Sequence, residues 1–389
     1  MSRVNAWLLP LGLFLITAAF AAGAEACPGC PQSAPTFAEE FDTMDVVTIA
    51  RLIAAPAPSK DKNAAAGDLP LGKFEITHVL KGGNAARPKE VIETLYLGEA
   101  KVGTSFLILG INRGNLQWST PFPLSSRGPD YLEKVVKLPK DGQKRLEFFQ
   151  TYLEDEDSDL ASDAYNEFAR APHAAVKALK ESMNHDKLVG WITDKNVPQN
   201  HRRLYLLMLG ICGSEKDRLL LEKLIKSTDR QEKQGLDSVI SCYLQLRGEA
   251  GVPLIEDLYL KDKKCEYADT YAAIIALRFQ LSDGKAVPAK RVLSALHYML
   301  ERPDLADLII PDLARYEDWS QADKLFALYK NSDEKSSWVR VPVITYLRAC
   351  PLPKAKELLQ ECQKIDPKAY ERGSLFLITP SPPAAAQKS

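Results

Sequence analysis

The chain has few of the side chains that build metal centres and catalytic sites. Its 389 residues include seven cysteines and five histidines, and residues 31–211 contain no cysteine. The histidines are scattered, without a His-x-x-x-His spacing or a Cys/His cluster, and zinc-protease, nucleophile-elbow, phosphate-loop and dinucleotide motifs are missing. We therefore expect no enzyme activity, no cofactor and no metal centre.

An excess of charge of either sign is also missing. Lys and Arg number 50 and Asp and Glu 51, so the sequence offers no basic footprint for nucleic acid and no polybasic patch for a membrane surface. With 46% hydrophobic and 26% charged residues, the composition is typical of a soluble globular protein. The length exceeds that of one ordinary core and favours two domains.

Long apolar runs are confined to the first residues. Arg3 precedes the run AWLLPLGLFLITAAFAAGA, which ends in small residues, as a secretory signal peptide does. Cleavage at Ala22-Gly23-Ala24 or at Ala24-Glu25-Ala26 predicts a signal peptide over residues 1–24 or 1–26, and hence a secreted or periplasmic protein. A retained anchor is the alternative, because the run approaches the ~20 residues that span a bilayer. We expect no membrane span in the mature chain.

Two of the cysteines, Cys27 and Cys30, lie where the predicted mature chain begins. Ala24 and Glu25 fit a lipid-attachment signal poorly, and half a metal site would need a second pair nearby. The open alternatives are a local Cys27–Cys30 disulfide, a bond to a C-terminal cysteine, and a role in thiol–disulfide exchange. The flanking prolines disfavour exchange, because an exchange-active pair sits at a helix N-terminus that lowers the thiol pKa.

From Phe37 to about Leu109 the pattern is that of β-strands. The segments that predict strands are residues 44–53, 73–80, 90–97 and 104–111. The glycine-rich segment 81–84 predicts a turn. Since no helical pattern alternates with these strands, we expect a small antiparallel barrel rather than a parallel sheet.

Several short segments of this region share a characteristic order and spacing. They are Asp45-Val46-Val47, Phe74, Ile76, Val79, Lys81-Gly82, Gly103 and Phe106-Leu107. Together they resemble the netrin-like module found in tissue inhibitors of metalloproteinases, which implies an OB-type barrel over residues 27–128. The resemblance also implies an inhibitor hypothesis, in which cleavage after Ala26 leaves Cys27 as the terminal residue that chelates a protease zinc. The chain departs from the family in its Cys27-x-x-Cys30 spacing and in having no cysteine partners within the barrel.

The C-terminal half repeats itself with a helical period. Residues 201–224 align without a gap on residues 339–362. Between these blocks, equivalent leucines lie 35, 33, 36 and 34 residues apart, at Leu209, Leu244, Leu277, Leu313 and Leu347. Each interval has room for a helix, a short turn and a second helix, and the repeat resembles HEAT repeats. We therefore predict a multidomain α+β chain, with an OB-like barrel followed by a HEAT-like α-solenoid over residues 129–372 and a disordered tail over 373–389.

Such a solenoid favours a binding or scaffold function for protein partners on one curved face. Trp319 and Trp338 are candidate binding anchors, with packing between repeats as the alternative. Arg202 and Arg340 occupy equivalent positions in the two aligned blocks and are further candidates, again with repeat packing as the alternative.

Overall fold

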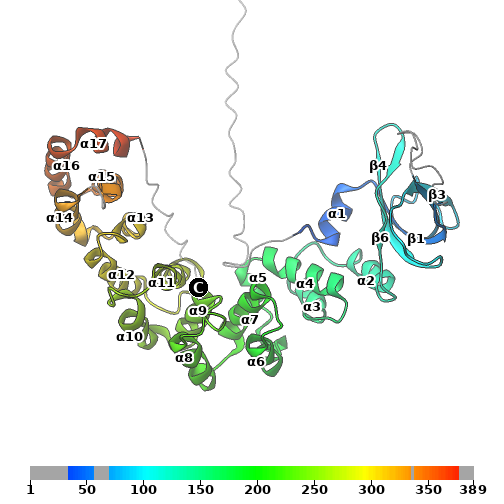
Figure 1. The fold of residues 1–389 in the computed structure, drawn as a ribbon, viewed down its shortest axis with the longest axis horizontal. Coiled ribbons are helices and arrows are strands. Elements are labelled where there is room, and N and C mark those ends of the chain that lie inside the picture. Colours follow the sequence, from blue (N-terminus) through cyan, green and yellow to red (C-terminus); the bar gives the residue numbers. More distant parts are fainter. Residues whose placement is uncertain (1–33, 57–69, 334–336, 376–389) are drawn as a thin grey trace, which may run out of the picture.

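The computed structural model describes residues 34–56, 70–333 and 337–375. The predicted signal peptide, Cys27, Cys30 and residues 376–389 of the predicted tail lie outside these ranges. A nearly closed antiparallel β-barrel stands at one end of the molecule, and an open arc of helices extends from it to α17 at the other end (Figure 1). Within the described ranges, no helix is both long and apolar enough to cross a bilayer.

The barrel is one antiparallel sheet in the order β3-β2-β1-β4-β5, with β6 also paired to β4. Its strands are β1 (Val46–Ala54), β2 (Leu71–Lys81), β3 (Val91–Leu95), β4 (Ser105–Asn112), β5 (Leu116–Trp118) and β6 (Phe122–Pro123). The first four match the predicted strands, whereas β5 and β6 are short additions. The two edges approach where the Thr94 hydroxyl on β3 donates to the Ser119 carbonyl, just after β5, at 3.1 Å.

Strands β1 and β4 are buried on both of their faces, which explains their nearly continuous apolar sequence. Toward the barrel interior they contribute the buried residues Val46, Ala50, Leu52, Phe106 and Ile108. Toward the helices they contribute Val47, Ile49, Leu107 and Leu109. Inside the barrel the rings of Phe74, Tyr96 and Phe106 meet edge to face, with centroids 5.3–5.6 Å apart.

The prediction of a β pattern beginning at Phe37 was wrong, because Phe37–Thr43 forms helix α1. The Thr36 hydroxyl accepts from the Glu39 amide while the Glu39 carboxylate accepts from the Thr36 amide, a capping box that starts the helix. At its other end, the Lys81 amine donates to the carbonyl of Phe41 at 2.6 Å. Strand β1 therefore begins only after this helix.

The predicted turn after β2 is present and depends on Gly82. Its φ is +81°, a left-handed conformation that favours glycine. A Cβ atom at this position would lie 2.5 Å from the carbonyl oxygen of Asp45. The turn therefore lets the end of β2 approach the start of β1 without a side chain between them.

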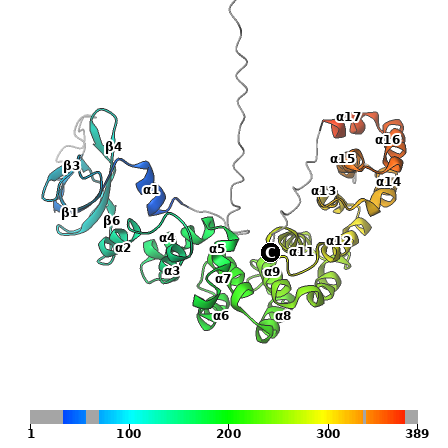
Figure 2. The same cartoon turned by 180° about the vertical axis from the view of Figure 1, so that it is seen from behind.

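The helices after the barrel are α2 (Gly128–Val135), α3 (Gln143–Gln150), α4 (Ser158–Arg170), α5 (His173–Lys177), α6 (His185–Thr193), α7 (Gln199–Cys212), α8 (Arg218–Lys226), α9 (Leu236–Arg247), α10 (Val252–Ile255), α11 (Tyr267–Phe279), α12 (Ala289–Leu296), α13 (Ile310–Arg315), α14 (Ala322–Asn331), α15 (Arg340–Ala349), α16 (Pro353–Ile365) and α17 (Pro367–Ser374). Along the arc, α9, α11, α13 and α15 lie toward the concave side, and α8, α10, α12, α14 and α16 toward the convex side (Figures 1 and 2). Helix α17 extends two residues into the predicted tail.

The predicted spacing of 33 to 36 residues corresponds to one pair of helices. The five equivalent leucines are all buried, one each on α7, α9, α11, α13 and α15. Ion pairs link successive concave-side helices at the same spacing: Arg203 on α7 pairs with Asp237 on α9 at 2.6 Å, and Arg278 on α11 with Asp312 on α13 at 2.8 Å. In both ion pairs, 34 residues separate the partners.

The barrel and the helices share one hydrophobic core, which includes the outward residues of β1 and β4. The carboxylate of Asp163 on α4 connects them further, since it accepts from the Phe37 amide at 2.8 Å and from the Tyr131 hydroxyl at 2.6 Å. Burial raises the pKa of this carboxyl group to about 6. The barrel is thus packed onto the first helices, and no free linker separates it from them.

Candidate functional site

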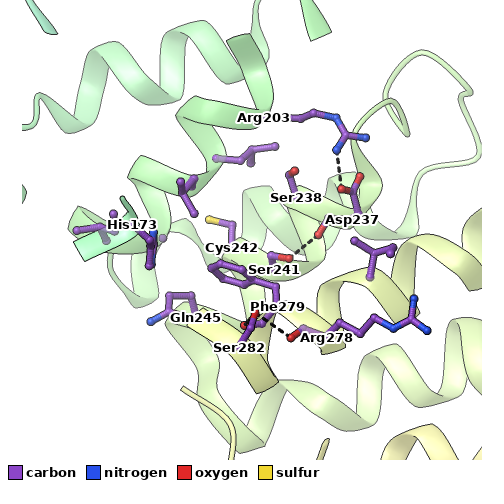
Figure 3. Close-up of a pocket in the computed structure, with 15 residues that line it drawn as sticks. His173, Arg203, Asp237, Ser238, Ser241, Cys242, Gln245, Arg278, Phe279 and Ser282 are labelled. Carbon is purple, nitrogen blue, oxygen red and sulfur yellow. Dashed lines mark hydrogen bonds and ion pairs between the residues drawn. The ribbon is translucent and has the colours of Figure 1, made fainter. Parts of the chain in front are cut away.

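A cavity of about 210 Å³ opens among helices α5, α7, α9 and α11 (Figure 3). Four apolar side chains, Leu206, Leu207, Ile211 and Ile275, form much of its wall, and Phe279 also lines it. The residues of α7 that line it fall three and four positions apart, which places them on one face of that helix. The cavity is therefore built from one face of each of several helices that lie about one repeat apart in the sequence.

Gly210 contributes to the cavity by lacking a side chain. It lies inside α7, where glycine is ordinarily unfavourable. A Cβ atom placed on it would lie 3.4 Å from Cβ of Gln245 and 3.6 Å from Cα of Cys242, both on α9, which is ordinary van der Waals contact. The glycine thus leaves open a part of the wall that an alanine would fill.

The most unusual polar group of the cavity wall is His173, at the start of α5. Its side chain is buried, with 6% of the residue exposed, and neither ring nitrogen has a hydrogen-bond partner among the described residues. The ring meets Phe279 edge to face, with centroids 5.6 Å apart. Burial, reinforced by nearby Lys177, lowers the pKa of His173 to about 4, so the imidazole is neutral at pH 7.

The remaining polar side chains of the cavity differ in how well they are satisfied. The Ser241 hydroxyl donates to the carbonyl of Asp237 at 2.7 Å. In contrast, the side-chain carbonyl of Gln245 is buried without a hydrogen-bond partner among the described residues. Burial raises the pKa of the Cys242 thiol far above its usual value, so this cysteine stays protonated and unreactive.

The cavity continues along α11 as a stripe of partly exposed residues. Tyr267 and Tyr271 are 56% and 37% exposed, and their rings stack with centroids 5.8 Å apart. Ile275 and Arg278 follow at the next helical intervals and line the cavity. We call Tyr267, Tyr271 and Ile275 the tyrosine stripe.

The tryptophan candidates lie elsewhere, and neither lines the cavity. Trp319 is partly buried and packs edge to face against Tyr346, with centroids 5.1 Å apart, which fits the packing alternative. Trp338 is 47% exposed in a short helical turn, Ser337–Val339, just before α15.

The two equivalent arginines are engaged inside the protein. Arg202 reaches the carbonyls of Glu232 and Gln234 at 3.4 and 3.5 Å, in the segment that leads into α9. Arg340 donates to the Ser332 hydroxyl and carbonyl and to the Asp366 carboxylate, at 2.7–2.9 Å. Both guanidinium groups therefore join neighbouring helical segments, as the packing alternative proposes.

The sequence does not predict the cavity, although part of its pattern can be read from the chain. In the sequence His173 is one of several scattered histidines, and the apolar face of α7 is part of a repeat. Across the part of the chain that the structure describes, no group of three or more His, Cys, Asp or Glu side chains is arranged to hold a metal ion.

No protein-family model matches this chain, and comparison with curated proteins and with solved structures finds no similar one.

Proposed function

We propose that this chain is a non-enzymatic binding protein that holds a protein partner on the concave side of α7, α9 and α11. In this proposal the helical arc is a HEAT-like solenoid, the barrel is a netrin-like OB-type module, and the protein works outside the cytoplasm as a secreted or periplasmic scaffold. The predicted leader supports the compartment, and the two-helix spacing supports the solenoid.

The tyrosine stripe is the observation that carries the proposal. Two exposed, stacked tyrosines and a half-buried isoleucine form a continuous line that leads to an apolar cavity. Tyrosine is enriched in protein interfaces because it buries a large apolar ring while its hydroxyl keeps a hydrogen bond. Tyrosine is also among the residue types that most often carry the binding energy of a protein interface.

The chemistry of the same site favours binding over catalysis. The Cys242 thiol is held protonated by burial, which removes its nucleophilicity. Arg203 and Arg278 at the cavity are each neutralised by an aspartate on the next helix.

The test is capture of partners by full-length protein carrying Tyr267→Ser and Tyr271→Ser. The full chain is needed because cutting it after the barrel would expose Val47, Ile49, Leu107 and Leu109, which pack against the helices. We expect partner recovery from the secreted or periplasmic fraction of the native cells to fall about tenfold or more, measured by quantitative mass spectrometry after crosslinking.

The matched control is Leu219→Ser, which removes an exposed apolar side chain from α8 on the convex side. Partner recovery with this control should equal that of the unchanged protein. Equal losses in both variants, or none in either, would contradict binding at the tyrosine stripe. Loss of a metalloproteinase partner on Cys27→Ser, with the stripe variants unaffected, would instead support the inhibitor hypothesis.

A further inference from the structure

We propose that the cavity among α5, α7, α9 and α11 binds a small uncharged molecule made of one aromatic ring and one hydroxyl or N–H group. This inference goes beyond partner binding and does not depend on it. It is carried by three properties of the cavity: its size, its apolar wall, and hydrogen-bonding groups that the protein itself leaves unused.

The size of the cavity selects a single ring. An apolar cavity of about 150 Å³ in another protein is large enough to bind benzene. The cavity here, at about 210 Å³, therefore accommodates one six-membered ring with one or two small substituents. A fused polycyclic molecule or a long chain would extend into solvent.

The wall favours a flat apolar ring without a charge. Leu206, Ile211 and Ile275 present aliphatic carbons, and Phe279 presents an aromatic ring to the cavity. Aromatic rings pack well against such groups in edge-to-face or offset geometry. Arg203 and Arg278 are already paired with Asp237 and Asp312, so neither is a free counter-ion for a charged ligand.

The unused polar groups select the substituent. A neutral imidazole has one nitrogen that donates and one that accepts, and neither nitrogen of His173 is used by the described residues. The Gln245 side-chain carbonyl provides a second unused acceptor in the wall. In this proposal the His173 ring, which lines the cavity, turns about its Cβ–Cγ bond so that one nitrogen faces the ligand, and a ligand hydroxyl donates to that nitrogen or accepts from it according to the tautomer. Buried polar groups without partners are uncommon, and a ligand of this class satisfies them.

The experiment compares phenol with toluene, which have nearly the same shape but differ in the hydrogen-bonding group. Binding to the full-length protein is measured by calorimetry and by saturation-transfer NMR. We expect saturable binding of phenol and at least about tenfold weaker binding of toluene, because toluene leaves the buried polar groups unpaired. Benzoate should show no binding, because the site has no unpaired cation.

His173→Phe is the decisive variant, because it keeps an aromatic ring against Phe279 while removing both nitrogens. It should fold, and its preference should reverse, so that toluene binds at least as tightly as phenol. The matched control is His78→Phe, which replaces an exposed histidine on β2 and should leave the preference for phenol unchanged. Gly210→Leu, which places a side chain in the cavity, should abolish binding of both molecules.

Three results would overturn the proposal. The first is no saturable binding of phenol by the unchanged protein. The second is a ratio of phenol affinity to toluene affinity that stays the same in His173→Phe, or binding of either molecule by Gly210→Leu, because the ligand would then lie elsewhere. The third is N-acetyl-tyrosine amide binding as tightly as phenol, which would assign the cavity to a side chain of a protein partner and not to a free small molecule.

Discussion

The barrel and the central helices differ in whether all of their buried polar groups have hydrogen-bond partners. In the barrel, the Thr48 hydroxyl donates to the Ile108 carbonyl at 2.9 Å, and the Tyr96 hydroxyl accepts from the Ala100 amide at 2.9 Å. In the helices, the ring of His173 and the side-chain carbonyl of Gln245 have no such partners. Among the described residues, every buried side-chain nitrogen or oxygen without a hydrogen-bond partner belongs to the stretch from Gln150 to Gln280.

This difference bears on the stability of the two regions. Unpaired buried polar groups destabilise a protein, and native structures contain few of them. In the described part of the barrel no such group is found, and the barrel interior also holds three aromatic rings in edge-to-face contact. Two of the residues with such groups, His173 and Gln245, line the apolar cavity, and these are the groups that the proposed ligand would pair with.

The largest effect is expected from Phe74→Ala in the barrel. The Phe74 ring is completely buried and contacts both Tyr96 and Phe106. Its removal should lower the free energy of unfolding by about 3–5 kcal/mol, measured by denaturant titration. Phe122→Ala, at a partly exposed ring that contacts Phe37, is the control and should cost only about 1 kcal/mol. Similar losses of unfolding free energy in the two variants would show that the barrel interior is not tightly packed around Phe74.

His173→Phe should change how stability depends on pH. The pKa of His173 falls from its ordinary 6.5 to about 4 in the fold, so the folded protein prefers the neutral ring. The stability that this provides is present above pH 6.5 and is lost as pH falls toward 4, by up to about 3 kcal/mol. Relative to the unchanged protein, the variant should therefore gain stability as pH falls, in denaturant titrations between pH 7 and 4. A constant difference across this range would contradict burial of an unpartnered imidazole.

Asp163→Asn should show a pH dependence of opposite sign. Burial raises the pKa of Asp163 from 3.8 to about 6, despite the Tyr131 and Phe37 donors that favour the carboxylate. The folded protein thus prefers the protonated acid, and this stability is present below pH 3.8 and lost as pH rises through 6, by up to about 3 kcal/mol. The variant should therefore gain stability relative to the unchanged protein as pH rises from 4 to 7.

The asparagine can keep both contacts of Asp163, accepting from the Phe37 amide and donating to the Tyr131 oxygen. Tyr131→Phe serves as the control, because it removes one donor but leaves the buried acid in place. If the free energy of unfolding of Asp163→Asn changed with pH as it does in the unchanged protein, the junction between barrel and helices would not contain a carboxyl group whose pKa burial raises.

The strands and the helical spacing were predictable because each depends on a local pattern. The nearly continuous apolar run along residues 104–111 matches the two buried faces of β4, and leucines one repeat apart mark successive concave-side helices. Helix α1 is not predicted, although Thr36 and Glu39 have the spacing of a capping box, because the apolar β1 segment that follows favours a strand.

The cavity could not be predicted in the same way. It needs the relative rotation of α7, α9 and α11, and the position of a histidine on α5 that lies outside the repeat alignment. Residue type alone instead favoured Trp319, which packs against Tyr346, and Arg340, which binds Ser332 and Asp366. Large or charged side chains mark packing between repeats as readily as they mark a binding surface.

The smallest expected effect, and a direct test of how open the cavity is, comes from Gly210→Ala compared with Gly190→Ala. Gly190 is exposed on α6, and a Cβ atom placed on it would have no neighbouring atom within 4 Å, so its replacement reports helix propensity alone, a gain of about 1 kcal/mol. At Gly210 the added methyl group gains the same propensity and touches Gln245 and Cys242 at ordinary contact distance. If α7 and α9 leave the space described, Gly210→Ala should stabilise the protein at least as much as Gly190→Ala in parallel denaturant titrations. If the helices were packed more closely, the methyl group would be forced against α9, and the variant would be destabilised by about 1–3 kcal/mol. The sign of this difference therefore decides whether α7 and α9 leave the space described beside the cavity.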